Sequence, residues 1–348
     1  MMRSLRLLLW PFSLVYGLVV LLRNLLYDTG VFKSTAFALP VICVGNLVVG
    51  GSGKSPSTEY LIRLLSGYKI AILSRGYGRK TKGFILADEH ATASHIGDEP
   101  MQFYRKFPDV TVAVCEDRVR GVSLLKDQHD LIILDDAYQH RRIRAGMYIL
   151  LFEFSQLLRP QFLLPAGNLR ESFRGYRRAD AILVTKAPSV ISKYERNKCL
   201  SHFDKDHEVS FSSLAYQQLV PLFGAGQQQI NPSTVVFLIT GIANPRPLLT
   251  ELKKHTSQVI HHDYPDHYQF KEKDVEAFVE AYHKETALEK LLLTTEKDAQ
   301  RLLGGAFKEI LLNLPIFYLP VRIDVHQEDK DSFDRKILDY VASHTRDR

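Results

Sequence analysis

A glycine-rich loop directly after an apolar segment constrains the fold of this chain more than any other sequence feature. Residues 41–47 read VICVGNL, and residues 48–65 continue as VVGGSGKSPSTEYLIRLL. The loop matches the phosphate-binding pattern G-x-x-x-x-G-K-[ST], except that Val48 takes the position of the first glycine. Such a loop needs a buried strand before it and a helix after it, because loop amides and the helix N-terminus bind phosphate together. The sequence therefore predicts a strand–loop–helix unit that binds a nucleotide.

Apolar runs that alternate with amphipathic stretches extend this unit over most of the chain. The runs are short and rich in Ile, Val and Leu, as in parallel strands that helices cover on both faces. Along the chain they are residues 41–47, 69–74, 110–115, 131–136, 148–153, 181–186, 234–241, 258–264, 290–295 and 316–323. This rhythm predicts an α/β fold with doubly wound sheets.

The alternation of apolar runs and amphipathic stretches stops near residues 207–230. Here a segment in which apolar and polar residues alternate is followed by the loop-like GAGQQQINPS. A chain of 348 residues, 45% of them hydrophobic, is long enough for two domains with cores of their own. We therefore expect an N-terminal membrane-associated helix at 1–30, a larger P-loop domain at 31–206, a β-ribbon linker at 207–232 and a smaller C-terminal α/β domain at 233–348.

The N-terminal segment differs from the rest because it is apolar with cations only at its ends. Residues 7–22 carry no charge, and Arg3, Arg6 and Arg23 flank them. As a helix they would span about 24 Å, less than the ~30 Å hydrocarbon core of a bilayer, and no small-residue cleavage site of a signal peptide follows. The pattern favours an anchor that lies in the membrane plane or inserts obliquely. A helix buried against the protein's own core is the alternative.

The net charge and the cysteine content restrict the possible binding partners and the cellular compartment only slightly. The net charge of +6 fits an anionic partner such as phosphate, nucleic acid or an acidic membrane surface, without selecting one. Cys43, Cys115 and Cys199 show no metal-ligand spacing and fit a reducing cytoplasm.

The loop and a later acidic pair carry the chemistry of a nucleotide site. Lys54 is expected to reach the β- and γ-phosphates and Ser55 to ligate Mg²⁺; an ordinary glycine turn is the alternative. The run LIILDD ends in Asp135, the better candidate for a second Mg²⁺ ligand, with Asp136 in support. The aspartate with which GTPases read guanine is missing from LVTKAP at 183–188, so ATP is favoured over GTP. The predicted nucleotide-binding residues are Val48, Val49, Gly50, Gly51, Ser52, Gly53, Lys54 and Ser55.

Three further candidates each have an ordinary structural alternative. Asp98, in HIGDEPMQF, is either a helix N-cap or a carboxylate that accepts a proton from an attacking hydroxyl. Arg170 follows LLPAGN and is either a solvated cation or a bidentate ligand of a substrate phosphate. A lone histidine such as His267 is more often structural than catalytic, and His261 and His262 fall inside a strand pattern.

Together the motifs resemble those of the tetraacyldisaccharide 4'-kinase family, the lipid A biosynthetic kinases of Gram-negative bacteria. In order they are VGNLVVGGSGKSP, SRGYGR, GDEP, EDRVRG, LDDAYQHR, PAGNLRE, ADAILVTK, PDHY and TTEKDAQRL. Each motif is weak alone, but the ordered set covers most of the chain and is specific. The family usually has threonine at the position of Ser55, and both side chains carry the hydroxyl that Mg²⁺ needs.

This resemblance implies transfer of the γ-phosphoryl group of ATP to the 4'-hydroxyl of a tetraacylated glucosamine disaccharide 1-phosphate, which gives lipid IVA. It implies a site between two α/β domains joined by a β-ribbon, and a helix at the cytoplasmic face of the inner membrane. Asp98 would be the catalytic base and His267 its partner, with the histidines at 261–262 in a competing register. The residues that would line the nucleotide or lipid pocket are Arg75, Gln139, His140, Arg170 and Glu171.

Two other functions stay open beside this one. A P-loop GTPase or ATPase that loads metals or acts as a switch would need a Cys or His cluster, which the sequence lacks. A membrane-associated sensor would bind ATP but phosphorylate nothing. For the kinase we expect a lipid substrate and a membrane surface as partners, no nucleic acid, and a monomer.

Overall fold

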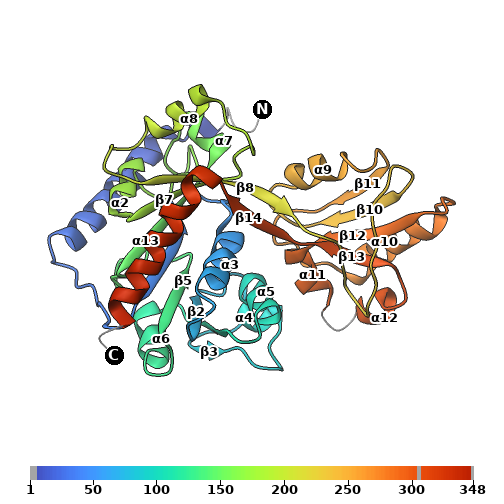
Figure 1. Ribbon diagram of the computed structural model, residues 1–348, viewed down its shortest axis with the longest axis horizontal. Helices are drawn as coiled ribbons and strands as arrows, with labels where there is room; N and C mark the ends of the chain where they lie inside the picture. The colour runs from blue at the N-terminus through green and yellow to red at the C-terminus, as the bar shows by residue number, and fades with distance from the viewer. Residues whose placement is uncertain (1–5, 304–306, 346–348) are drawn as a thin grey trace.

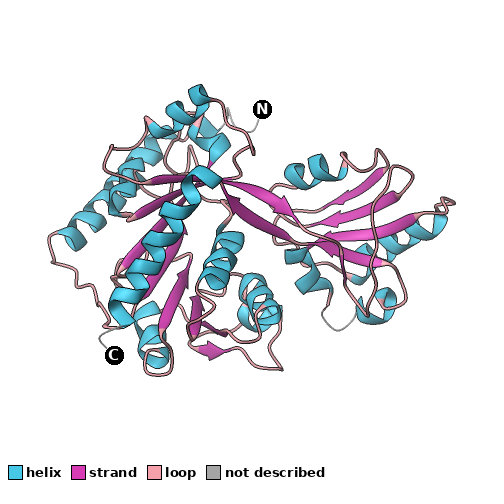
Figure 2. Ribbon diagram, viewed as in Figure 1, coloured by secondary structure: helices cyan, strands magenta, loops and turns pink. Residues whose placement is uncertain are grey.

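The chain forms two bodies, each built on one β-sheet (Figure 1). The computed structural model describes residues 6–303 and 307–345. In both bodies helices cover the faces of the sheet (Figure 2), so the predicted α/β class is confirmed. The larger sheet contains, in chain order, β1 (Val41–Asn46), β2 (Ile70–Ser74), β3 (Ile85–Leu86), β4 (Thr111–Val114), β5 (Leu131–Asp135), β6 (Met147–Glu153), β7 (Ala181–Thr185), β8 (Val209–Tyr216) and β14 (Val321–Val325).

The larger sheet is parallel except at its two edges. Its order is β14-β8-β7-β6-β1-β5-β2-β4-β3, and only the edge strands β14 and β3 run antiparallel to their neighbours. Strands β1, β2, β5 and β7 are buried along their whole length, which explains their continuous apolar runs. Because β1 lies between β6 and β5, the loop that follows it emerges at the centre of the carboxyl edge.

Helices cover both faces of this sheet. One core joins the strands to α3 and α13, through Leu61 and Ile62 on the first and Phe333 and Ile337 on the second. The opposite face is covered in part by α6, through Val122 and Leu125. The helices of this body are α2 (Trp10–Asp28), α3 (Lys54–Leu64), α4 (Ala93–Ile96), α5 (Asp98–Lys106), α6 (Arg118–Leu125), α7 (Phe154–Leu157), the 3-10 helix η1 (Phe173–Arg178), α8 (Lys193–Leu200) and α13 (Gln327–Thr345).

The smaller sheet has the order β11-β10-β12-β13-β9, with β9 antiparallel at one edge. Its cores lie on both faces, one against α10 and α11 and the other against α9. The elements are β9 (Val220–Pro221), β10 (Val235–Thr240), α9 (Arg246–Leu252), β11 (Val259–Asp263), α10 (Glu272–Lys284), β12 (Lys290–Thr295), α11 (Glu296–Leu302), α12 (Lys308–Leu311) and β13 (Ile316–Leu319).

The C-terminal residues return to the larger body, which differs from the predicted range 233–348. The single strand expected at 316–323 is two strands in two sheets, because the chain leaves β13 at Pro320 and enters β14. β14 pairs with β8 from Val321 opposite Tyr216 to Val325 opposite Ser212, and the two strands connect the bodies (Figure 1). The expected ribbon at 207–232 therefore takes its partner strand from outside that range, and we propose a smaller domain that ends near residue 320.

The N-terminal helix α2 is docked by polar groups and exposes its apolar side chains. Ser13 is its one buried residue, and Oγ of Ser13 donates a hydrogen bond to the Leu163 carbonyl at 3.1 Å. Tyr16 Oη donates to the Arg170 carbonyl at 2.7 Å, and Asn24 Nδ2 donates to Glu171 at 3.1 Å. The interpretation as a buried core helix is wrong, since only 6% of the helix is buried. The predicted range 1–30 begins with residues 1–5, which lie outside the described residues.

Candidate active site

The glycine loop adopts the backbone that phosphate binding needs. Gly50 and Gly53 have φ angles of 114° and 80°, a region that disfavours side chains, and α3 begins directly after Gly53. The unusual Val48 is buried and forms a β-bridge with Leu169, so the chain there is extended and needs no glycine. Since α3 begins directly after the loop, the N–H groups of its first turn, which lack intrahelical partners, lie where they can bind an anion.

Side chains at the carboxyl ends of β1 and β7 hold the loop in place. Thr185 Oγ1 donates to the Ser52 carbonyl at 2.9 Å, and Asn46 Nδ2 donates to the Ser52 hydroxyl. Lys186 Nζ donates to the Gly51 carbonyl and pairs with Glu153 at 3.2 Å. Lys186 thus supports the backbone of the loop.

A carboxylate cluster lies beside the loop, at the end of β5 and the start of α5. Lys54 Nζ lies 3.7 Å from Asp136 Oδ2, and Arg170 Nη1 lies 3.1 Å from Asp136 Oδ1. Ser55 Oγ donates to Glu99 Oε1 at 3.2 Å. Burial, with the nearby charges of Glu99 and Asp136, raises the pKa of Asp135 to about 7.

The donors in this cluster suit a hard divalent cation that also binds phosphate. Asp135 Oδ1 is buried and has no hydrogen-bond partner within residues 6–303 and 307–345. No group of three or more acidic, His or Cys side chains forms a ready metal site in the same residues. Mg²⁺ commonly takes one or two carboxylates and completes its shell with phosphate oxygens and water, so the residues fit this ion.

The second constellation joins the two bodies at Asp98, the first residue of α5. His267 Nδ1 lies 3.2 Å from Asp98 Oδ2, and Arg301 reaches the same oxygen with Nε at 2.9 Å and Nη2 at 2.6 Å. Burial opposes ionisation, but the hydrogen bonds from His267 and Arg301 outweigh it, so the pKa of Asp98 lies below its usual value. The geometry thus brings Asp98 and His267 together. It does not bring His261 to Asp98, because this side chain bonds to Thr240 at 2.8 Å.

A backbone turn places His267 for this contact. Its φ angle is 59°, and its N–H donates to the Gly241 carbonyl at 2.9 Å. Tyr77 packs edge-on against the imidazole with ring centroids 5.1 Å apart. The imidazole is therefore held from both bodies.

Arg301 and Lys297 complete the constellation and were not predicted as site residues. Lys297 Nζ lies 3.2 Å from His267 Nε2 and 3.2 Å from Glu99 Oε1, which links the histidine to the Ser55 side of the site. Arg301 is additionally paired with Asp298 at 2.7 Å. The two cations are four residues apart on α11, so they share one helix face. The four-residue spacing in TTEKDAQRL indicates a shared helix face, but the sequence carries no signal that directs this face to Asp98.

An ion pair and a hydrogen bond also connect α5 to α11 and set the distance between the two bodies. Lys106 Nζ contacts Glu59 at 2.8 Å and Glu296 at 2.5 Å. Arg105 Nη1 donates to Gln300 at 2.8 Å. Asp98 on α5 and His267 in the turn after β11 therefore meet because a wider interface between α5 and α11 holds the two bodies together.

Three of the predicted substrate residues, Gln139, Arg170 and Glu171, form a third group that contacts α2. Gln139 Nε2 donates to Glu171 Oε1 at 3.1 Å, and Arg170 Nη1 lies 3.4 Å from Gln139 Oε1. His140 is half-buried, and burial lowers its pKa to about 4, so it is neutral at pH 7. Arg75 is exposed and makes no ion pair within the described residues.

The carboxylate of Asp98 should make the free energy of unfolding decrease as the pH becomes acidic. A carboxyl whose folded pKa is lowered stabilises the fold above its unfolded pKa, and this contribution is lost as pH falls through the folded value. We expect Asp98→Asn to reduce the free energy of unfolding by about 1–3 kcal/mol at pH 7 and by clearly less at pH 3. Urea unfolding of both proteins at the two pH values measures this; an equal difference at both would contradict it.

Comparisons with known proteins agree with this geometry. The sequence profile of the Tetraacyldisaccharide-1-P 4'-kinase family matches residues 5–342. The chain is 41% identical to a tetraacyldisaccharide 4'-kinase of Bacteroides thetaiotaomicron, covering 97% of this chain and 94% of that one. It is 43% identical to one of Flavobacterium psychrophilum, covering 99% of each chain.

A solved structure shares the fold over almost the same length. It is the "apo" form of LpxK from Aquifex aeolicus in complex with ATP, with a TM-score of 0.74 and 29% identity, covering 98% of this chain and 99% of that chain. As its ordered motifs predict, the chain belongs to the tetraacyldisaccharide-1-P 4'-kinase family.

Proposed function

We propose that this protein transfers the γ-phosphoryl group of ATP to the 4'-hydroxyl of tetraacyldisaccharide 1-phosphate, a step of lipid A biosynthesis. The observation that carries this proposal is the contact of Asp98 with His267 across the two bodies. Glu99 beside Asp98 contacts Ser55 of the phosphate loop, so the candidate base and the loop belong to one site. Family membership supplies the substrate class.

In this proposal, the loop and its cations place and neutralise the phosphates. Lys54 projects from the start of α3 and supplies positive charge at the transferring group. Mg²⁺, bound by Ser55 and Asp135 with support from Asp136, would neutralise charge on the β- and γ-phosphates.

Asp98 accepts the proton of the attacking hydroxyl, and its neighbours position it. His267 and Arg301 both contact Oδ2, which fixes the orientation of the carboxylate. The ionic contact with Arg301 keeps Asp98 deprotonated at neutral pH, and Lys297 holds the other side of the imidazole. Asp98 is therefore ready to accept a proton, whereas His267 acts as a positioning residue.

The direct test is an assay with ATP, Mg²⁺ and the lipid disaccharide. The expected product is heavier by one phosphoryl group, located at the 4'-oxygen by mass spectrometry. ATP hydrolysis without change in the lipid would favour a nucleotide switch, and ATP binding without hydrolysis or transfer would favour a sensor. Either result would refute the kinase proposal.

Exposed leucines on α2 are proposed to hold the protein at the cytoplasmic face of the inner membrane. Leu18 and Leu22 are 66% and 55% exposed, one turn apart, while the polar groups of α2 face the protein. Within the described residues this is the one helix long and apolar enough to cross a membrane, by length and composition. A helix with its polar side docked and its apolar side outward suits an interfacial anchor.

Charging this surface should therefore release the protein from lipid. Leu18→Glu/Leu22→Glu is expected to weaken vesicle binding at least about 100-fold, because burying each leucine in hydrocarbon gives roughly 1.5–3 kcal/mol. Vesicle cosedimentation measures the effect, and thermal unfolding should not change because both side chains are exposed. The matched control, Val190→Glu/Leu288→Glu, alters two other exposed side chains and should bind as the wild type. Wild-type binding by the α2 variant would contradict the anchor.

A further inference from the structure

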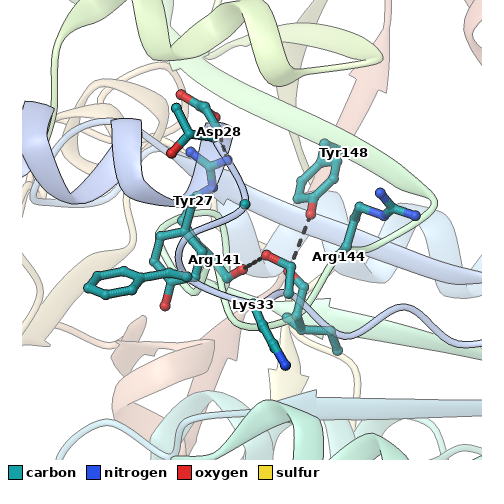
Figure 3. A pocket seen from close by; sticks show the side chains of 11 residues that line it. Tyr27, Asp28, Lys33, Arg141, Arg144 and Tyr148 are labelled. Carbon is teal, nitrogen blue, oxygen red and sulfur yellow. Dashed lines mark hydrogen bonds and ion pairs between the residues drawn. The ribbon is translucent and has the colours of Figure 1, made fainter.

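A cavity opens where α2 ends and the chain turns toward β1. Its volume is about 600 Å³, and its wall includes Tyr27, Asp28, Phe32, Lys33, Arg141 and Arg144 (Figure 3). Among the described residues of this wall, Asp28 is the one acidic side chain against three cations, so the cavity carries net positive charge.

The cations of the cavity have donor capacity that the protein does not use. Arg141 Nη2 pairs with Asp28 at 2.7 Å, and its guanidinium lies 5.5 Å from the Tyr27 ring centroid. Its Nη1, in contrast, is buried without a hydrogen-bond partner in the described part of the chain. Lys33 and Arg144 are exposed and form no ion pair among the same residues. An unsatisfied buried donor between free cations fits an anionic ligand.

Backbone contacts hold these cations together. Thr35 N donates to the Arg142 carbonyl at 2.8 Å, and Arg144 N donates to the Thr35 carbonyl at 2.8 Å. Ser34 Oγ donates to the Arg141 carbonyl at 2.6 Å. The segment after α2 is therefore tied to the segment that carries Arg141 and Arg144, and the cavity is a built feature of the fold.

Exposed apolar side chains lie at the cavity and close to it in sequence. Phe32 lines the cavity and is 44% exposed, its neighbour Val31 is 65% exposed, and Leu25 near the end of α2 is 53% exposed. Positive charge beside exposed apolar side chains is suited to a phosphate group at the level of lipid headgroups. A lipid ligand at this cavity rests on the proposed membrane association of α2.

We propose that this cavity binds the phosphodiester headgroup of an anionic phospholipid, a second lipid beside the substrate. The substrate side of α2 begins about one turn earlier, where Asn24 contacts Glu171 and Arg23 Nη2 donates to the Gln139 carbonyl at 2.6 Å. Gln139 contacts Arg170, which pairs with Asp136 beside the phosphate loop. A phospholipid bound at the end of α2 would set the depth and direction of the helix at the membrane.

The test compares phosphatidylcholine vesicles with vesicles that also contain phosphatidylglycerol, at constant ionic strength. Because a basic residue near an anionic surface gives about a fivefold gain in affinity, Lys33→Gln/Arg144→Gln should lose about 30-fold of the phosphatidylglycerol-dependent affinity. Its affinity for pure phosphatidylcholine vesicles should stay unchanged. The control Lys253→Gln/Lys273→Gln removes the same charge from exposed positions of the smaller body and should keep the gain. Equal losses in both variants, or no loss in the first, would overturn the proposal.

Soluble probes separate this proposal from the membrane proposal. Monomeric dihexanoyl phosphatidylglycerol should raise the melting temperature of the wild type but not of Lys33→Gln/Arg144→Gln, whereas dihexanoyl phosphatidylcholine should raise neither. This result would support the cavity even if the protein failed to bind vesicles. Equal stabilisation by inorganic phosphate would assign the cavity to free phosphate and overturn the lipid assignment. A raised KM of the variant for the disaccharide substrate in detergent would assign the cavity to the substrate and also overturn it.

Discussion

Replacing Asp98 with alanine is expected to lower turnover about 10²–10⁴-fold, the usual worth of general-base catalysis, while ATP still binds. The 4'-hydroxyl is a poor nucleophile at neutral pH, and Asp98 is the buried carboxylate that both bodies orient. ATP affinity should persist because the phosphate loop belongs to other elements, between β1 and α3. The measurement is kcat at saturating substrate, with ATP affinity determined separately. A normal rate would eliminate Asp98 as the base.

The same experiment extends to a double-mutant cycle with His267. If His267 acts only through Asp98, then His267→Ala added to Asp98→Ala should cost little more, because residues that act as a unit lose activity non-additively. Multiplicative losses would show that the two residues act independently.

Folding needs its own control in this series, because Arg301 is buried and contacts Asp98 through two nitrogens. Removing the carboxylate leaves this guanidinium with Asp298 as its charged partner. Asp98→Asn keeps the shape and one acceptor oxygen, so it should fold more stably than the alanine variant yet remain as inactive. Activity in Asp98→Asn close to the wild type would mean that the alanine defect is structural.

Lys54→Ala should lower turnover at least about 10²–10³-fold, the usual effect of removing one preorganised group that stabilises transition-state charge. The fold should survive, because the ion pair of Lys54 with Asp136 is long, at 3.7 Å, and Asp136 keeps Arg170. Thermal unfolding and kcat at saturating ATP are the measurements, with Lys82→Ala, at an exposed position, as the control. A folded variant with near-normal activity would show that the phosphate-loop assignment is wrong.

Local patterns were enough to predict the buried parallel strands and the phosphate loop. The strand before the loop was expected at 41–47 and is Val41–Asn46, and the helix begins at Lys54 as the motif requires. Such features depend on neighbours in sequence: buried parallel strands read as apolar runs, and positive φ angles select Gly50 and Gly53. The same reasoning placed Asp135 and Asp136 at the end of a strand, where the carboxyl edge of the sheet collects polar groups.

The sequence by itself thus determined the α/β class, the phosphate loop, the family and the pairing of Asp98 with His267 that the family resemblance implied. Tertiary structure alone decided three other features. Pro320 separates one apolar run into strands of two sheets, because pairing partners far along the chain choose the sheet. The apolar side of α2 faces outward because Ser13, Tyr16 and Asn24 find partners on the protein.

The third feature is the completion of the site by Arg301 and Lys297. Both cations look like a solvated helix face in sequence, yet α11 packs against α5 and directs them to Asp98 and Glu99. Asp98 and Arg301 are 203 positions apart, and no local rule of propensity or spacing reports such a pair. At the interface between the two bodies these charged side chains are buried, and a buried charge must be paired to remain ionised. They therefore contact one another and form a single connected site.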